Sequence, residues 1–309
     1  MASSWVKHVA ALDLGTNTFN LIISQDDKPF PPVYRAEKGV FIGKGGLKNK
    51  TILPEALIRA KNVLKEYSNI LKEYNVIQIS AVATEAIRNA NNGSEILEKL
   101  NTEIPSSIQK INGKREAELI WSGVASSGLL TDKTAMIIDI GGASTEIIIA
   151  NNDHIKWLKS YKVGVSRALE LIPVNDLPSE KDLSALSEYF KSNMKDLNDI
   201  LVKFQPESLI GTAGSFDSWR KNLEIKNNDS IPFYKFIADN LIDLIRKINK
   251  TPLQDRAAIK GIPELRKETI VPAGILIQNL LDIYNFKTVY QCDYSLAEGL
   301  IREMTKKQI

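Results

Sequence analysis

The sequence of 309 residues has a single cysteine, Cys292, and only two histidines, His8 and His154. One cysteine cannot form an internal disulfide, which is typical of proteins from a reducing compartment. Two isolated histidines make a histidine zinc site or a Ser-His-Asp triad hard to assemble. Any chemistry is therefore expected to depend on carboxylates, arginines and backbone amide groups.

Long apolar runs and a large net charge are also missing. No segment approaches the roughly 20 apolar residues that span a bilayer, and the first residues lack the charged-then-apolar layout of a signal peptide. We therefore expect a cytoplasmic protein without a membrane partner. The net charge of +3 is too small to indicate a nucleic-acid-binding protein, although it is compatible with a basic cleft that collects a polyanion.

Two segments of the chain, Val9–Ile23 and Ala135–Ile149, repeat one pattern. Each has a buried strand with an aspartate near its end, then a short polar turn with glycine, then a second apolar strand. The two aspartates, Asp13 and Asp139, lie about one domain's length apart. The repeat predicts two similar domains, each of which opens with a β-hairpin.

Strands alternate with helical patterns along the rest of the chain, which indicates an α/β fold. Pro54 and the apolar residues at helical spacing after it predict a helix. Ser179 and Asp182 indicate another helix start, with helical spacing continuing to Phe204. The remaining expected helices are 116–130, which would link the two halves, 232–248, 269–284 and 295–306, and the remaining strands are 76–83, 208–212 and 287–291.

The turns of the repeat have the composition of phosphate-binding loops. They are Gly15-Thr16-Asn17-Thr18 and Gly141-Gly142-Ala143-Ser144-Thr145. Glycine lets backbone N–H groups approach an anion closely, and Ser and Thr hydroxyls add donors. An ordinary hairpin turn explains either loop alone. The duplication, with a strand aspartate before each loop, favours phosphate binding.

Asp13 and Asp139 stand at the ends of apolar strands, where an ionised carboxylate is costly unless it is paired or binds a metal. Each could simply cap its own turn through local hydrogen bonds. The repeated placement favours Mg²⁺, with Mn²⁺ as the alternative, because Mg²⁺ takes one or two carboxylates together with waters and phosphate oxygens.

Each of two charged residues near the start of predicted helices could have either of two roles. Arg88 could hold a phosphoryl group with its forked guanidinium, or be a solvated helical arginine. Glu116 could be catalytic, or could simply interact with the helix dipole. Other phosphate motifs fail: Gly39–Gly45 is one residue short of a Walker loop, and Gly43–Lys48 does not complete a dinucleotide fingerprint. Both are expected to be surface turns.

Together these motifs resemble those of the exopolyphosphatase/guanosine pentaphosphate phosphatase family, a branch of the actin, Hsp70 and sugar kinase superfamily. The resemblance is collinear over nearly the whole chain, and the segment from Asp139 to Glu146 is its most specific part. The other matching segments are Asp13–Thr18, Ala83–Arg88, Gly113–Ala117, Gly164 with Arg167, Gly211–Gly214, Ala273–Gly274 and Glu298–Gly299.

The resemblance implies two ribonuclease H-like (actin-like ATPase) domains with a cleft between them. Residues 1–121 with about 296–309 would form the first domain, and 122–295 the second. It also implies a short form without the helical C-terminal domain of longer members, and it allows a homodimer, although no motif shows one.

The same resemblance implies roles for individual residues. Glu116 would be the base that activates the attacking water, and Glu146 a second catalytic carboxylate that helps to place the water or the metal. Asp139 would anchor Mg²⁺, and Arg88 would bind the terminal phosphate. The implied substrate is inorganic polyphosphate or a phosphorylated guanosine nucleotide.

The sequence departs from the family pattern at several positions. Arg115 replaces a glutamate, and Ala143 replaces a glycine, so a negative φ is expected there. Phe41 and Ala297 stand where the family often has arginine.

Several functions remain to be separated. An exopolyphosphatase is the leading hypothesis, and a guanosine pentaphosphate phosphatase is the alternative. A kinase or ATPase of the same superfamily, or a non-enzymatic nucleotide sensor, would share the fold. The Gly211–Gly214 segment either contacts a nucleotide or is a plain strand-to-helix turn.

Overall fold

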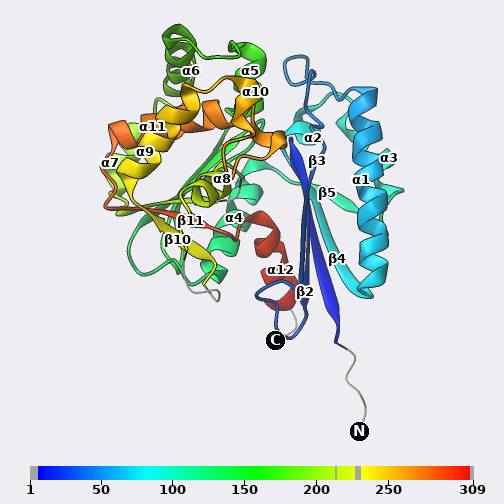
Figure 1. Cartoon of the computed structure of the whole chain (residues 1–309). Helices are drawn as coiled ribbons and strands as arrows, with labels where there is room; N and C mark the ends of the chain where they lie inside the picture. Colours follow the sequence, from blue (N-terminus) through cyan, green and yellow to red (C-terminus); the bar gives the residue numbers. More distant parts are fainter. Residues whose placement is uncertain (1–5, 213, 227–230, 307–309) are drawn as a thin grey trace. The chain divides into compact units, whose positions relative to one another are not determined.

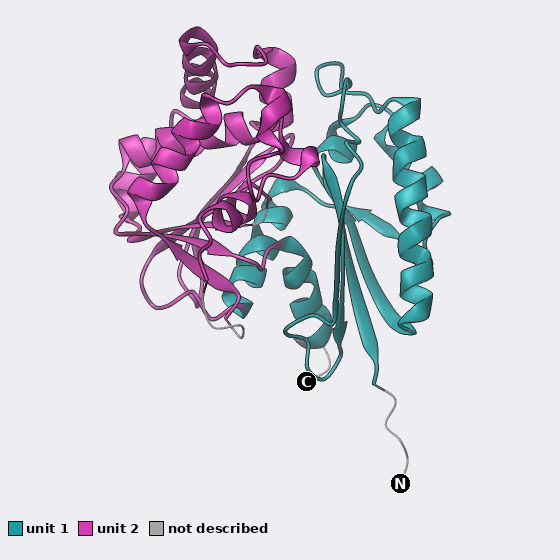
Figure 2. Ribbon diagram, viewed as in Figure 1, with its two compact units in different colours: residues 1–126, 296–309 teal, residues 127–295 magenta. Residues whose placement is uncertain are grey.

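The computed structural model describes residues 6–212, 214–226 and 231–306. The chain forms two compact units (Figure 2): unit 1 contains residues 1–126 and 296–309, and unit 2 contains residues 127–295. The last helix of the chain thus belongs to the same unit as the first strand. Among the described residues, no helix is long and apolar enough to cross a lipid bilayer.

Unit 1 is built on a five-stranded sheet with the strand order β3-β2-β1-β4-β5. β1 to β3 are antiparallel neighbours, whereas β1, β4 and β5 run parallel. The strands are β1 (His8–Leu14), β2 (Thr18–Gln25), β3 (Tyr34–Gly39), β4 (Val76–Ala83) and β5 (Ile108–Lys110).

Helices cover both faces of this sheet (Figure 1). α1 and α3 lie on one face, and α4 and α12 lie on the other. The helices are α1 (Pro54–Glu73), α2 (Glu85–Asn89), α3 (Gly93–Asn101), α4 (Gly113–Ser126) and α12 (Leu296–Lys306). The predicted apolar stripe of α1 is confirmed, because Ala60, Leu64, Tyr67 and Leu71 are all buried.

Unit 2 is built on a six-stranded sheet with the order β10-β11-β9-β6-β7-β8. β6 to β8 are antiparallel neighbours, and β6, β9 and β11 run parallel. The strands are β6 (Ala135–Ile140), β7 (Thr145–Ala150), β8 (Ile155–Tyr161), β9 (Ser208–Thr212), β10 (Phe233–Phe236) and β11 (Thr288–Cys292).

The helices of unit 2 surround α11, which is apolar on nearly every side and buries most of its residues because it contacts α5, α6, α8 and α9. The helices are α5 (Val165–Leu171), α6 (Glu180–Asn193), α7 (Leu197–Phe204), α8 (Gly214–Asn222), α9 (Ala238–Asn249), α10 (Leu253–Arg256), the 3₁₀ helix η1 (Glu264–Arg266) and α11 (Ile270–Ile283). The predicted start of α6 is confirmed, since Ser179 and Asp182 form a capping box.

Both units repeat one topology: a three-stranded antiparallel meander whose first strand pairs in parallel with a later strand, β4 or β9, which in turn pairs in parallel with β5 or β11. The hairpins β1–β2 and β6–β7 are the two predicted repeats. The α/β class and the two ribonuclease H-like units expected from the sequence are confirmed.

Three predicted elements differ from the structure. Residues 233–236 form β10, which pairs with β11, so the helix expected from 232 begins only at Ala238. Helical structure stops between α6 and α7, where Asp196 accepts hydrogen bonds from Lys159 and Tyr161 on β8. α4 ends at Ser126 rather than near 130, just before Gly128 with a φ of 77°.

Candidate functional site

The first loop of the repeat, between β1 and β2, is a tight turn. The Gly15 N–H donates to the Thr18 carbonyl at 3.0 Å. A Cβ atom on residue 15 would lie 2.9 Å from that carbonyl oxygen, so glycine is required by the close approach of the backbone.

A segment that follows β3 braces this loop. Val40 and Phe41 donate their N–H groups to the Asn17 carbonyl at 2.8 Å each, and Gly43 donates to the Thr16 carbonyl at 3.4 Å. Arg59 in turn holds the segment through the carbonyls of Val40 and Phe41. The expectation of a simple surface turn here is wrong for Val40, Ile42 and Gly43, which are buried.

The second loop, between β6 and β7, has the same turn. The Gly141 N–H donates to the Ser144 carbonyl at 2.9 Å, and a Cβ atom on residue 141 would lie 2.8 Å from that oxygen. Ala143, which replaces the expected glycine, is not among the described non-glycine residues with positive φ. Its negative φ was predicted from the sequence.

The beginning of α5 braces the second loop. Val165 donates to the Gly141 carbonyl at 3.1 Å, while Ser166 and Arg167 donate to the Gly142 carbonyl at 2.8 and 3.0 Å. The Arg167 side chain donates from Nε to the Ala143 carbonyl at 2.9 Å. These contacts also satisfy N–H groups of the first turn of α5, which have no partners within the helix.

This bracing decides which way the backbone N–H groups of the second loop point. In a trans peptide the C=O and the N–H point in opposite directions. Since the carbonyls of residues 141–143 face α5, the N–H groups of Gly142, Ala143 and Ser144 face the other way. Within the part of the chain that the structure describes, none of these N–H groups has a hydrogen-bond acceptor. The arrangement is the concave set of donors typical of anion-binding loops.

The two strand aspartates occupy equivalent positions but have different partners. Asp13 Oδ2 accepts from Asn20 Nδ2 at 3.2 Å, and Asn20 pairs with Asp13 in the hairpin register. Glu146 is the residue opposite Asp139 in the equivalent register of β6 and β7. Sequence reasoning missed Asn20, although its spacing from Asp13 equals that of Glu146 from Asp139.

Asp139 lies among hydroxyl groups. Its Oδ2 accepts from Ser295 Oγ at 2.7 Å. Desolvation by burial raises the pKa of Asp139, and the hydroxyls of Ser295 and Thr212 oppose that rise. Among the described residues no lysine or arginine forms an ion pair with Asp139. Ser295 was not predicted, because it reaches Asp139 only through the parallel pairing of β6, β9 and β11.

The oxygen atoms around Asp139 are compatible with a divalent cation. A cation would favour the ionised carboxylate, and oxygen ligands are what Mg²⁺ prefers. In the described ranges there is no group of three or more His, Cys, Asp or Glu side chains that could hold a metal. Few protein ligands are needed, however, by a Mg²⁺ ion that also binds water and phosphate oxygens.

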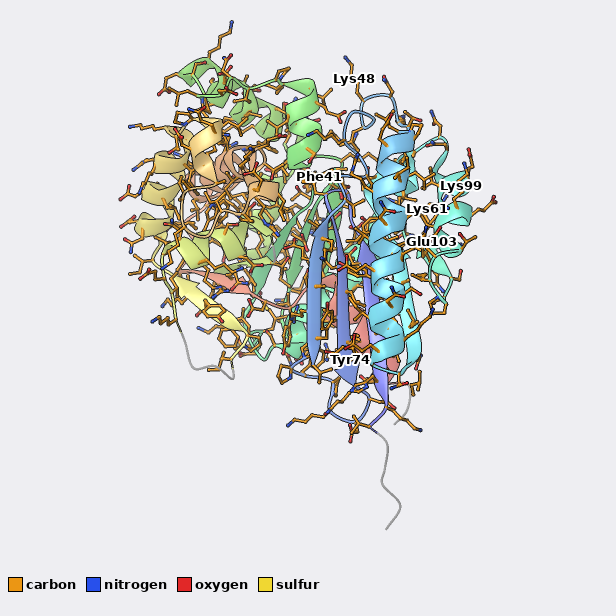
Figure 3. The ribbon with its side chains drawn as sticks, turned by 45° about the vertical axis from the view of Figure 1, so that its right-hand side comes forward. Phe41, Lys48, Lys61, Tyr74, Lys99 and Glu103 are labelled. Carbon is orange, nitrogen blue, oxygen red and sulfur yellow. The ribbon has the colours of Figure 1, made fainter. Side chains whose placement is uncertain are left out.

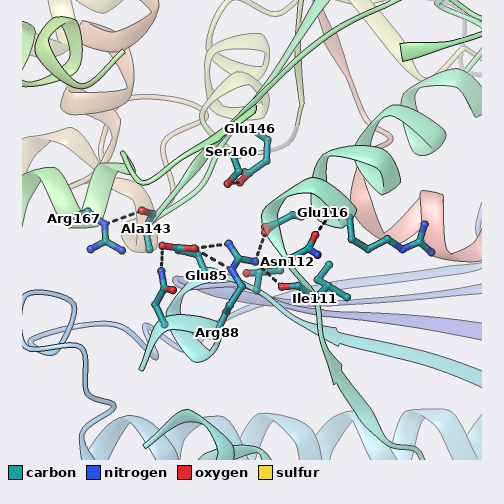
Figure 4. Close-up of polar contacts among 12 residues, drawn as sticks. Glu85, Arg88, Ile111, Asn112, Glu116, Ala143, Glu146, Ser160 and Arg167 are labelled. Atoms are coloured by element: carbon teal, nitrogen blue, oxygen red, sulfur yellow. Dashed lines mark hydrogen bonds and ion pairs between the residues drawn. The ribbon is translucent and has the colours of Figure 1, made fainter. Parts of the chain in front are cut away.

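Arg88 and Glu116 come together in unit 1 because β4 and β5 run parallel, so the elements after both strands meet at one edge of the sheet. Arg88 Nη1 donates to Glu116 Oε2 at 2.9 Å and to the Ile111 carbonyl at 2.8 Å (Figure 4). The other edge of the guanidinium contacts Glu85, which sequence reasoning did not single out.

Glu146 is buried on β7 of unit 2, where its Oε1 accepts from Ser160 Oγ on β8 at 2.6 Å (Figure 4). The hydroxyl fixes one oxygen of the carboxylate. Ser160 was not predicted either, since a cross-strand partner depends on the register of β7 and β8.

The Gly211–Gly214 segment joins β9 to α8, and its Ala213 lies outside the described residues. A Cβ atom on Gly211 would lie 2.2 Å from the Phe216 ring, and Gly214 has a φ of 54°. Close packing and a left-handed backbone explain both glycines as parts of a strand-to-helix turn.

A model described as the Ppx/GppA phosphatase family matches residues 21–308. A relative from Fusobacterium nucleatum, named a bifunctional 3-dehydroquinate synthase/phosphatase, is 31% identical over 313 residues, which cover 95% of this chain and 46% of the relative. A relative from Photobacterium profundum, named a guanosine-5'-triphosphate,3'-diphosphate pyrophosphatase, is 23% identical. The match covers 96% of this chain and 59% of the relative. The chain thus spans about half the length of these relatives.

A solved structure is similar over almost the full length of both chains. It is the crystal structure of an exopolyphosphatase from Cytophaga hutchinsonii, which is 30% identical, with a TM-score of 0.92, and the match covers 97% of this chain and 98% of that one. A family member from Aquifex aeolicus shares the fold at 23% identity, with a TM-score of 0.79.

Proposed function

The chain belongs to the Ppx/GppA phosphatase family, and on this premise we propose that it releases terminal orthophosphate from inorganic polyphosphate. The observation that carries the proposal is the set of N–H groups on Gly142, Ala143 and Ser144, which point away from α5 and have no acceptor among the described residues. Polyphosphate presents a row of anionic oxygens, which such donors bind without reorganisation. The resemblance to the Cytophaga exopolyphosphatase favours polyphosphate over a nucleotide.

In the proposed reaction, the oxygen of a water molecule attacks the terminal phosphorus and the anhydride P–O bond breaks. The shortened polyphosphate leaves with the electrons of that bond. Glu116 accepts the proton of the water, and Arg88 holds the carboxylate of Glu116 in place. We propose that phosphates bind to the N–H groups of Gly142, Ala143 and Ser144 and to the Ser144 hydroxyl, and that Gly15, Thr16, Asn17 and Thr18 form a second phosphate-binding loop. Phosphoryl transfer depends mainly on such positioning and charge stabilisation. Thr145, which was also predicted to bind phosphate, is not suited to it, because its buried hydroxyl donates to the Val163 carbonyl.

Ppx/GppA phosphatases are generally metal-dependent, and we propose Mg²⁺ as the ion, with Mn²⁺ as a substitute. Asp139 would hold it, with Asp13 as a second candidate ligand. When bound, the ion neutralises charge on the phosphate oxygens. Glu146, fixed by Ser160, would orient the attacking water or a metal-bound water.

The test is a substrate panel. We expect phosphate release from long-chain polyphosphate with Mg²⁺, little from ATP, and none with EDTA. Preferential cleavage of guanosine pentaphosphate would instead support the pyrophosphatase named among the relatives. ATP turnover that depends on a sugar, with polyphosphate inert, would favour a kinase. Tight binding without any turnover would favour a sensor.

Glu116→Gln tests the proposed base directly. We expect turnover to fall by about a hundred- to ten-thousandfold, because general base catalysis contributes on this scale, while polyphosphate still binds. Glu118→Gln is the matched control, since Glu118 lies on the same helix and is more exposed. If turnover of the Glu116 variant stays within a few-fold of wild type, Glu116 is not the base.

A further inference from the structure

The hydrogen bonds of Arg88 leave it little capacity for a substrate. A guanidinium has five N–H groups. In this structure Nε and Nη2 donate to Glu85 Oε2, and Nη1 donates to the Ile111 carbonyl and to Glu116 Oε2. One N–H, on Nη2, is left. A forked grip on a phosphoryl group is therefore not available in this arrangement, and Arg88 is held between Glu85 and Glu116.

Glu85 is the residue that sets the plane of the guanidinium. It is the first residue of α2, and its side chain is 3% exposed, compared with 15% for Arg88 and 8% for Glu116. Its Oε1 accepts from Asn89, so both carboxylate oxygens have donors. Glu85 is thus fixed within α2 and contacts the edge of Arg88 that faces away from Glu116 (Figure 4).

Two buried carboxylates, those of Glu85 and Glu116, share the guanidinium of Arg88. A glutamine at position 85 has only one acceptor oxygen and would not hold Nε, Nη2 and Asn89 in the same way. Both carboxylate oxygens of Glu85 are therefore needed for this set of contacts.

α2 itself is anchored to the first loop. The Thr84 N–H, immediately before Glu85, donates to the carbonyl of Leu14 at 3.3 Å. Leu14 directly precedes Gly15. The position of Glu85 relative to the first loop is therefore fixed by the backbone rather than by a flexible side chain.

We propose that Glu85 is a positioning residue for the reaction: it holds the Nε and Nη2 edge of Arg88, so that Nη1 keeps the Glu116 carboxylate oriented toward the attacking water. Glu85 does not contact substrate. This inference rests on the proposed function, because it assigns Glu116 the role of base. It differs from a phosphate-binding role for Arg88, in which Glu85 would compete with the substrate.

The two roles predict different kinetics for Glu85→Gln with polyphosphate. If Glu85 positions Glu116, kcat falls by about ten- to a hundredfold, the scale of a misplaced catalytic group, and KM stays within about twofold because no substrate contact is lost. A lower KM would show that Arg88 had been released to bind phosphate, and it would overturn the proposal. Unchanged kcat and KM would overturn it as well.

The matched control is Glu103→Gln. Glu103 is also a poorly exposed glutamate of unit 1, 11% exposed at the side chain, and it pairs with Lys61 of α1 at 2.9 Å (Figure 3). It does not contact Arg88. We expect its removal to leave both kinetic constants within about twofold, as for most ion-pair changes away from a site.

Glu85→Asp covers the case in which the glutamine variant does not fold. It keeps the charge but withdraws the carboxylate by one methylene, so the same loss of kcat at constant KM is expected. Wild-type kinetics for Glu85→Asp would overturn the proposal.

An NMR measurement separates this inference from the proposed function. The Nε–H signal of Arg88 is assigned by its absence in Arg88→Lys and should be protected from exchange in the wild type. We expect it to shift in Glu85→Gln and in Glu116→Gln, and not in Glu103→Gln. If the wild type released no phosphate from any substrate, the proposed function would fail, but the signal would still test the geometry. If the Nε–H signal of Arg88 did not shift in Glu85→Gln, the inference would be overturned.

Discussion

Gly164 lies against the peptide unit between Gly142 and Ala143. A Cβ atom built on Gly164 would be 2.5 Å from the carbonyl carbon and oxygen of Gly142 and from the nitrogen of Ala143. No real Cβ approaches a backbone so closely, so the residue before α5 has to be glycine for α5 to brace the second loop. The requirement comes from contact between two backbones and not from an unusual φ.

Gly164→Ala should therefore damage the second loop. To make room, either the loop or the start of α5 must move, which redirects the N–H groups of Gly142 and Ala143. We expect kcat/KM for polyphosphate to fall by at least about tenfold, since misplacements of about 1 Å have effects of this size. Steady-state phosphate release measures it.

Gly128→Ala is the control for the loss of a glycine. Gly128 has a φ of 77° and no atom within 4 Å of an added Cβ. The left-handed backbone should cost about 1 kcal/mol of stability without changing kcat/KM. If both alanine variants had equal activity, the second loop would not depend on Gly164.

The sequence was sufficient to predict the turns and helix starts that depend on a local pattern of residues. The strand, the glycine turn and the returning strand recur around Gly15 and Gly141, and the structure has the same N–H to carbonyl turn in both loops. Helix starts with local signals were also predicted, as at Pro54 and Ser179. These features are decided by a few neighbouring residues, so one sequence contains the information.

What the sequence could not provide depends on pairing between distant strands. Ser295 reaches Asp139 and Glu85 shares Arg88 with Glu116 only because parallel strands end at one sheet edge. Residues 233–236 were expected to be helical, but they form a strand because they pair with β11. The equal spacing of Asn20 and Glu146 from their aspartates was a signal that could have been used.

Arg88→Ala is expected to affect stability as well as activity. It leaves Glu85 and Glu116 buried without their shared cation, and removing one partner of a buried ion pair costs about 3 kcal/mol or more. Chemical denaturation should show this loss in the free energy of unfolding. The double variant Glu85→Ala with Arg88→Ala should recover part of it, because one of the two carboxylates that lost the arginine is also removed. If the two single changes were simply additive, the residues would not be coupled.

Gly299 controls the distance between α12 and α4. A Cβ atom on Gly299 would lie 2.0 Å from the Leu119 carbonyl oxygen, and α4 also bears Glu116. We expect Gly299→Ala to lower the free energy of unfolding by about 1–3 kcal/mol, as overpacking does, and to lower kcat more than it changes KM. Denaturation and steady-state kinetics measure the two effects. An unchanged kcat in a destabilised variant would show that α4 moves without disturbing Glu116.

Asp139→Asn tests the metal site through stability, independently of turnover. Burial raises the pKa of Asp139 above its usual value, so the folded state binds this proton more tightly than the unfolded state does. The contribution of Asp139 to stability therefore decreases as the pH rises from the unfolded value of about 4 through the raised folded value. Without divalent metal, Asp139→Asn should then be more stable than the wild type near pH 8, and the advantage should shrink toward about pH 5.

Mg²⁺ should reverse the order of stability of the wild type and Asp139→Asn. An ion held by Asp139 favours the ionised carboxylate and stabilises the folded state by mass action, so the wild-type Tm should rise with Mg²⁺ and rise more at higher pH. Asparagine can still accept the hydrogen bond from Ser295, but it has no charge to attract the ion, so the Tm of the variant should respond little. Thermal denaturation with EDTA and with Mg²⁺ at both pH values makes the comparison. Equal Mg²⁺ responses of the two proteins would place the ion elsewhere in the molecule.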